Sequence, residues 1–133
     1  MKDATMKHIH AVAWIDHNEA HIIHFNADES EQLTVHSKHR KGHLHHKSGQ
    51  VGDGRSPEDH PFYQAASDAL MGAEKILIVG PANAKSELEK HMKHHARDLA
   101  ARIVGVETVD HPSDGQILKL ARKYFDVADR IPA

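Results

Sequence analysis

Residues 75–95 constrain the fold most, because they predict a strand, a tight turn and a helix in direct succession. Ile76 to Val79 form an unbroken apolar, mostly β-branched run, which is typical of a strand covered on both faces. Gly80 and Pro81 end that strand, and Asn83 is a suitable N-cap for a helix. Every fourth residue of the helix is apolar, which predicts one buried stripe: Ala84, Leu88 and Met92. The turn after such a strand is also where open α/β sheets place ligands.

The remaining apolar patterns predict four more strands and further helices. The strands are expected at residues 11–15, 20–27, 32–37 and 103–108, with Leu33 and Val35 on one half-buried face of the third. Helices are expected at 59–71, after the cap at Asn83 and after a cap at Ser113. Residues 99–109 are expected to hold the end of a helix and then the last strand. The order βββαβαβα predicts an α/β fold of the ribonuclease H-like type, a five-stranded mixed sheet with helices on both faces. All 133 residues are expected to form a single domain.

Composition narrows the class of protein. The chain has 15 histidines, no cysteine and a formal charge of −2, so it is nearly neutral but becomes cationic when its histidines are protonated. A nucleic-acid partner would therefore be held by a local patch. The absence of cysteine excludes disulfides and thiolate metal sites. Without a long apolar run or a signal-peptide pattern, we expect a cytoplasmic protein that does not enter membranes.

Residues 38–57, called here the basic segment, break the apolar pattern. The segment has four glycines, four histidines and five Lys or Arg, but only Leu44 and Val51 as aliphatic residues. It cannot bury itself, so we expect an exposed loop, and a loop this long is usually functional or disordered. Its cations face only Asp53 and are candidates for RNA contact: Lys38, Arg40, Lys41, Lys47 and Arg55. A solvated loop of no special function has the same composition.

Two enzymatic readings fit poorly. Two-metal nucleases need several converging carboxylates, yet only Asp16 ends a strand suitably, and the strand ending at Gly80 carries none. The turn after that strand resembles a phosphate loop, but it is one residue short and has Ala84 where a glycine is needed. We therefore expect neither nuclease nor nucleotide-hydrolysing activity. Lys85, at the helix start, remains a candidate for contacting an RNA phosphate.

Metal binding is an alternative. His91 and His95 lie four apart on one predicted helix, and His43 and His45 lie in the basic segment, so an imidazole site for zinc or nickel can be drawn from them. Among 15 histidines such pairs also arise by chance. The primary prediction is therefore that the protein has no specific metal site and no cofactor.

Three strings carry a family resemblance: AVAWIDHNEAHIIHF, HHKSGQVGDGRSPEDHPFYQAASDAL and KILIVGPANAKSELEKHM. They resemble the middle domain of eukaryotic and archaeal peptide-chain release factors and of Pelota. They are still more similar to the small bacterial release-factor-like proteins called translational machinery proteins. The similarity covers about residues 9–125 and includes VETVDHPSDGQILKLARKYF. It implies a ribonuclease H-like fold and a role on the ribosome.

The resemblance also implies roles for individual residues. Release factors carry a Gly-Gly-Gln motif after the third strand, and the matching place here reads Ser48, Gly49 and Gln50. By resemblance, Gln50 would orient water against the peptidyl-tRNA ester, Gly49 would be its hinge, and Lys47 and Arg55 would contact ribosomal RNA. Ser48 departs from the motif, and a serine in a left-handed conformation would be strained. The chain also lacks a codon-reading domain, and Pelota relatives keep the fold without the catalytic tripeptide.

The leading hypothesis is thus a translation-associated factor that binds the ribosome, ribosomal RNA or tRNA through the basic segment, with ester hydrolysis by Gln50 as a less favoured addition. A histidine-rich metal-binding or pH-responsive protein on the same scaffold is the alternative. A third is an interaction module that uses the sheet edge or the final helix. The sequence leaves the oligomeric state and the physiological trigger open.

Overall fold

A computed structural model describes residues 9–38 and 59–130, with side chains described as far as residue 126. Strands and helices follow one another in nearly the predicted order. The strands are β1 (His10–Ile15), β2 (Glu19–Phe25), β3 (Ser30–His36), β4 (Lys75–Gly80) and β5 (Ile103–Thr108). The helices are α1 (His60–Ala69), α2 (Ala84–His95), α3 (Arg97–Ala100) and α4 (Asp114–Arg130).

The strands form one mixed sheet in the order β3-β2-β1-β4-β5. The pairs β1–β2 and β2–β3 are antiparallel, whereas β1–β4 and β4–β5 are parallel. Three strands of a meander are therefore followed by two βαβ crossovers. This arrangement confirms the predicted five-stranded, ribonuclease H-like sheet.

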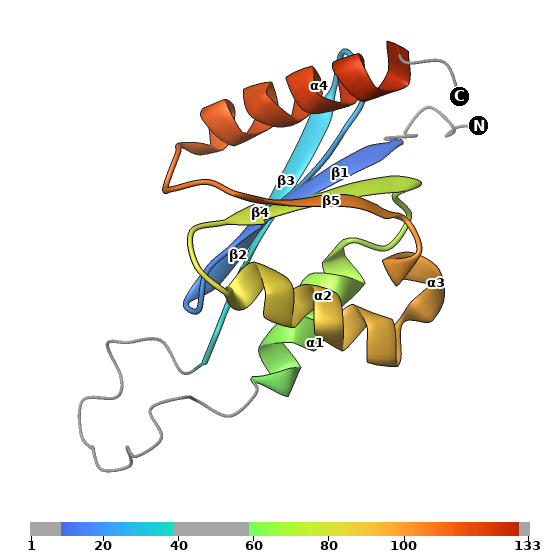
Figure 1. The fold of residues 1–133 in the computed structure, drawn as a ribbon. Coiled ribbons are helices and arrows are strands. Elements are labelled where there is room, and N and C mark those ends of the chain that lie inside the picture. The colour runs from blue at the N-terminus through green and yellow to red at the C-terminus, as the bar shows by residue number, and fades with distance from the viewer. Residues whose placement is uncertain (1–8, 39–58, 131–133) are drawn as a thin grey trace.

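Helices cover both faces of the sheet, as predicted (Figure 1). Successive side chains of a strand point to opposite faces, so β1 and β4 contribute to two separate apolar clusters. The larger cluster lies under α1 and α2 and includes Ile22, Ile78 and Leu88. The smaller one lies under α4 and includes Trp14, Phe25 and Phe125. All residues of Ile76 to Val79 are fully buried, as the apolar run predicts.

Gly80 ends β4 where two backbones come close together. A Cβ atom at this position would collide with the carbonyl oxygen of Ile15 on β1. Glycine is therefore needed here for space, and the chain turns immediately afterwards toward α2. In α2, Ala84, Leu88 and Met92 are fully buried, which confirms the predicted stripe.

The helix caps agree with prediction at one position and in part at another. Ser113 and Gln116 cap α4 reciprocally. The backbone N–H of Gln116 donates to Ser113 Oγ over 3.2 Å, and the backbone N–H of Ser113 donates to the side-chain Oε1 of Gln116 over 2.9 Å. Asn83 occupies the N-cap position of α2, but its side chain makes no capping hydrogen bond.

Two sequence predictions about individual elements were wrong. The single helix expected between the fourth and fifth strands is divided in two, because Ala96 adopts φ −149° and ψ 62° and separates α2 from the short α3. Leu33 is not half-buried with Val35; it is 44% exposed. The reason is that β3 is an edge strand, and of its described residues only Val35, which is partly buried, packs against the larger apolar cluster. Within the described residues, no helix is long and apolar enough to cross a membrane.

Candidate functional site

The basic segment is attached at the edge of the sheet where four strands end. Because β1, β3, β4 and β5 run in the same direction, their carboxyl ends share this edge. Residues 37 and 38 follow β3 at this edge. After the basic segment, the chain returns to the described fold at α1, which begins at His60. The sequence placed both the segment and the turn at Gly80 at strand ends, and this topology brings them to one side of the molecule.

The residues that flank the basic segment on either side, Ser37 and Asp59, are joined by a hydrogen bond. Ser37, which is only 3% exposed, donates its hydroxyl to Asp59 Oδ2 over 2.6 Å. Asp59 is also the N-cap of α1, where its Oδ1 accepts the Phe62 amide at 3.3 Å. One carboxylate therefore caps a helix and fixes the point where the segment leaves and re-enters the fold.

Most of the predicted RNA-contacting and catalytic residues lie outside the described residues. This group comprises Arg40, Lys41, His43, His45, Lys47, Gly49, Gln50 and Arg55. Lys38 is described and exposed beside Ser37. Lys85 is half-buried, and its ammonium donates to the carbonyl oxygen of Ala82 in the turn before α2. Its contact with an RNA phosphate stays a prediction.

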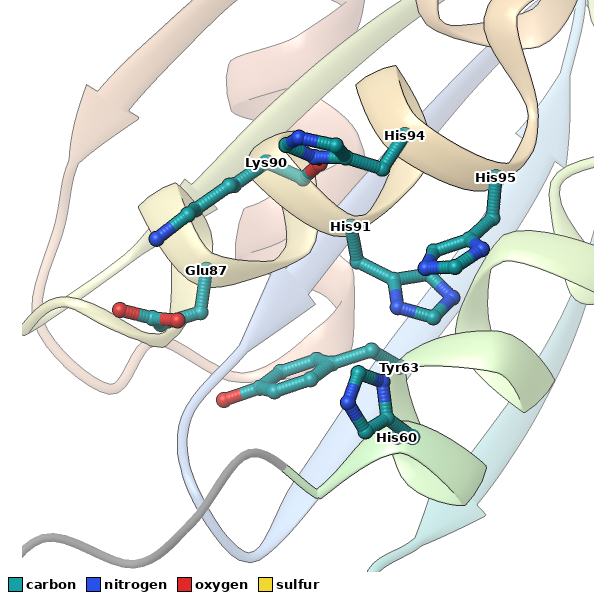
Figure 2. Close-up of a pocket in the computed structure, with 7 residues that line it drawn as sticks. All are labelled: His60, Tyr63, Glu87, Lys90, His91, His94 and His95. Carbon is teal, nitrogen blue, oxygen red and sulfur yellow. The ribbon is translucent and has the colours of Figure 1, made fainter.

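A cluster of three histidines lies between α1 and α2 (Figure 2). His60 is the first residue of α1, whereas His91 and His95 lie one turn apart on α2. One ligand nitrogen from each of the three lies within 4.8 Å of the other two. The ring centroids of His91 and His95 are 4.5 Å apart, and that of His60 is 5.7 Å from His91 and 6.1 Å from His95. We call these three residues the histidine triad.

His91 is held in place by a chain of hydrogen bonds along α1. It is 8% exposed, and its Nε2 lies 2.9 Å from Gln64 Oε1. Gln64 Nε2 donates in turn to Asp68 Oδ1 over 2.9 Å, which fixes the amide so that its oxygen faces the imidazole. An amide oxygen only accepts hydrogen bonds, so His91 carries its proton on Nε2 and keeps Nδ1 as a lone-pair donor.

The surroundings of His91 favour its neutral imidazole form. Burial lowers the pKa of His91, and the neighbouring His95 and His60 lower it further. His91 is therefore uncharged at neutral pH, which is the form that binds metal ions. The triad lines a pocket of about 170 Å³ that opens to solvent, together with Tyr63, Glu87, Lys90 and His94 (Figure 2).

Sequence reasoning found two members of the triad and missed the third. His91 and His95 were singled out by their i, i+4 spacing, and the structure brings them together. His60 was not considered, although it was the second residue of the predicted helix 59–71. The usable signal was topological, because right-handed crossovers from β3 to β4 and from β4 to β5 place both helices on the same face.

A second polar cluster lies on the opposite face and has a structural role. His21 bridges two carboxylates: its Nδ1 is 2.7 Å from Asp114 Oδ1, and its Nε2 is 2.9 Å from Glu19 Oε2. Burial would lower its pKa, but the hydrogen bonds and charges of Glu19 and Asp114 outweigh burial and raise it above 6.5. These contacts fasten the start of α4 to β2.

Asp16, the one carboxylate that suited a nuclease, is used in a turn. Its Oδ1 accepts hydrogen bonds from the backbone N–H groups of Asn18 and Glu19 at 2.8 and 2.9 Å, so it stabilises the β1–β2 hairpin. Its Oδ2 lies 3.7 Å from His111 Nε2. These contacts give Asp16 a structural role in the hairpin.

No protein-family model matches the sequence, and no curated protein matches it. Solved structures do match its fold. Pelota from Archaeoglobus fulgidus aligns with a TM-score of 0.58 and 11% identity over 86% of this chain and 30% of that one. Pelota from Thermoplasma acidophilum aligns with a TM-score of 0.56 and 19% identity over 86% and 32%. Dom34 from S. cerevisiae aligns with a TM-score of 0.54 and 9% identity over 85% and 32%.

The chain thus spans about a third of the length of these structures. At identities this low, the likeness is one of fold. The described residues therefore have a ribonuclease H-like fold, which the aligned parts of these structures share.

Proposed function

We propose that this chain is a translation-associated factor that contacts the ribosome, ribosomal RNA or tRNA through the basic segment. The observation that carries the proposal is the shared fold with Pelota and with Dom34, which is described as a translation termination-like factor in RNA quality control that interacts with Hbs1. The sequence resemblance to bacterial release-factor-like proteins points the same way. A role on the ribosome would also place the protein in the cytoplasm.

The chemistry of the basic segment supports contact with RNA. Five cations accompany a single Asp53 between Lys38 and Arg55, and phosphate contacts by Lys and Arg supply most of the non-specific affinity for nucleic acids. The anchored ends support it further, because the hydrogen bond from Ser37 to Asp59 presents the segment from one fixed point. Lys85 follows β4 at the same edge and is a further candidate contact.

Binding, rather than hydrolysis, is the proposed activity. Gln50 would have to orient water by position alone, since the resemblance supplies no general base. Ser48 stands where release factors have the first glycine of the motif. We expect that changing Gln50 to alanine leaves both ribosome binding and peptidyl-tRNA hydrolysis unchanged. Slower hydrolysis with intact binding would instead assign the catalytic role to Gln50.

Co-sedimentation with purified bacterial ribosomes at increasing salt tests the proposal. If about five phosphates are contacted, raising salt from about 50 to about 200 mM should weaken binding on the order of a hundredfold. Changing Lys41, Lys47 and Arg55 together to glutamate should abolish binding. The matched control changes three exposed cations elsewhere to glutamate, with the same change in net charge: Lys93, Lys119 and Lys123.

The two variants separate specific from general electrostatic binding. We expect the control variant to bind like the wild type at each salt concentration. Equal loss in both variants would show that only the net charge matters, and full binding by both would exclude the basic segment as the contact.

A further inference from the structure

We propose that the histidine triad, His60, His91 and His95, is a binding site for a divalent transition-metal ion such as Zn²⁺. This site uses no residue of the basic segment and does not depend on the proposed role in translation. It joins the start of α1 to the end of α2 on the face of the sheet that carries the larger apolar cluster.

The ligand set selects the class of metal. Among the residues that the structure describes, the ligand set is three imidazoles without a carboxylate. Such a set suits borderline ions such as Zn²⁺, Ni²⁺, Co²⁺ and Cu²⁺, whereas Mg²⁺ and Ca²⁺ require oxygen ligands. Three protein ligands also leave one position of a tetrahedral ion for water or another exogenous ligand. That position would face the solvent-open pocket, which Glu87, Lys90 and His94 also line.

The geometry needs only a small closure around the ion. Imidazole nitrogens bound about 2.0–2.1 Å from a tetrahedral ion lie about 3.4 Å apart, and the three candidate nitrogens already lie within 4.8 Å. His60 and His95 are exposed, so rotation of their side chains disturbs no packed core. His91 and His95 need no backbone movement to meet, because residues four apart share one face of a helix.

The polar neighbours of His91 resemble the outer shell of a metal site. Metal-binding histidines usually donate their second ring nitrogen to a carboxylate, carbonyl or water, which fixes the tautomer and the ring orientation. Here Nε2 donates to Gln64, and Gln64 is itself held by Asp68. The nitrogen that remains is Nδ1, so we assign Nδ1 as the metal ligand of His91.

The electrostatic surroundings of His91 are compatible with metal binding. Burial and then the neighbouring His95 and His60 lower the pKa of His91, which favours the neutral form of this ring, the form that binds metal ions. A shared metal ion would satisfy the three lone pairs at once. The three rings would then coordinate one ion together.

The test uses untagged full-length chain, purified without a metal column, treated with EDTA and titrated with Zn²⁺ near neutral pH. Calorimetry should show one tight equivalent, and saturation with Zn²⁺ should raise the melting temperature, because the ion binds only the folded arrangement of α1 and α2. Changing His60 or His95 to glutamine should weaken this equivalent by at least about tenfold. Both side chains are exposed, so these variants should keep the melting temperature of the metal-free wild type.

His94 provides the matched control. It lies next to His95, is exposed and lines the same pocket, but its Nδ1 donates to the Lys90 carbonyl over 3.0 Å and it is not part of the triad. Changing His94 to glutamine should leave the tight equivalent intact. Equal weakening in this variant, or only several weak equivalents in the wild type, would overturn the site. Loss of the tight equivalent when His43 and His45 are changed, with the triad intact, would also overturn it.

Two variants of Gln64 test whether this residue supports the metal ligand His91 through its hydrogen bond or only through packing. Changing Gln64 to leucine should weaken Zn²⁺ binding by about tenfold or more, whereas changing it to glutamate should preserve binding because a carboxylate still accepts from His91 Nε2. Unchanged affinity in the leucine variant would contradict the assignment of Nδ1. Because ribosome co-sedimentation uses other residues, failure of either proposal leaves the other open.

Discussion

At the scale of the residue, His21 shows how one side chain can make stability depend on pH. It is half-buried between Glu19 and Asp114, and its ring meets Trp14 edge-on at 5.6 Å between centroids. The two carboxylates raise its pKa above 6.5 despite burial. A histidine whose pKa is raised on folding stabilises the fold while it is protonated, and the stabilisation disappears as the pH rises through the folded-state pKa.

We therefore expect that changing His21 to glutamine costs more stability in acid than in alkali. The loss should be on the order of 1 kcal/mol at about pH 6 and should shrink by about pH 9, where the wild-type ring is also neutral. Urea unfolding at both pH values measures the difference. Changing the exposed His17 in the adjacent turn to glutamine is the control and should show no such trend. A larger loss at the higher pH would reverse the sign and contradict the account.

Single residues were also where sequence reasoning was weakest. Gly80 was predicted to end a strand, but the collision that a Cβ atom would cause with Ile15 depends on how β1 and β4 pair. His60 is 31 positions from His91 in the chain, so no local spacing connects them. The bridge from His21 to Asp114 spans 93 positions for the same reason. Local patterns identify strands and helices, whereas sites of this kind arise from the topology.

At the scale of the element, one residue, Asp59, both caps α1 and links the two parts of the fold that flank the basic segment. Its carboxylate caps α1 through the Phe62 amide and accepts the Ser37 hydroxyl from the end of β3. Changing Asp59 to alanine removes both interactions, so we expect a loss of about 1–3 kcal/mol in the free energy of unfolding.

Asparagine at position 59 is the matched control. Its amide oxygen can still cap α1, and the Ser37 hydroxyl can rotate to accept from its amide nitrogen, so most of the stability should return. Thermal and urea unfolding of both variants provide the measurement. Equal stability of the alanine variant and the wild type would mean that these two interactions contribute nothing.

Elements with a strong apolar period were predictable, and interruptions were not. The buried stripe of α2 and the reciprocal cap at Ser113 follow from residue types alone. The break at Ala96 has no such signal, because neither glycine nor proline lies there; the chain turns at this point to reach β5. The exposure of Leu33 depends on β3 being an edge strand, which is a property of the whole sheet.

At the scale of the whole molecule, the two faces of the sheet and its carboxyl end carry different features. One face carries α4, and the other carries α1 and α2 (Figure 1). The His21 bridge holds the start of α4 on the first face, and the histidine triad joins α1 and α2 on the second. The hydrogen bond between Ser37 and Asp59 lies where the strands β1, β3, β4 and β5 have their carboxyl ends, and these two residues flank the basic segment. In this account the folded body supports the segment, and the segment contacts RNA.

Replacing residues 39–58 tests that division most directly. The ends are already joined by the Ser37–Asp59 hydrogen bond, so a Gly/Ser linker of about six residues, with a typical span of about 13 Å, should connect them without strain. The shorter connection should leave the free energy of unfolding unchanged or raise it by about 1 kcal/mol. The measurement is ribosome co-sedimentation of this variant at low salt. The account predicts that binding is lost while the fold remains; a stable linker variant that binds ribosomes as tightly as the wild type would contradict it.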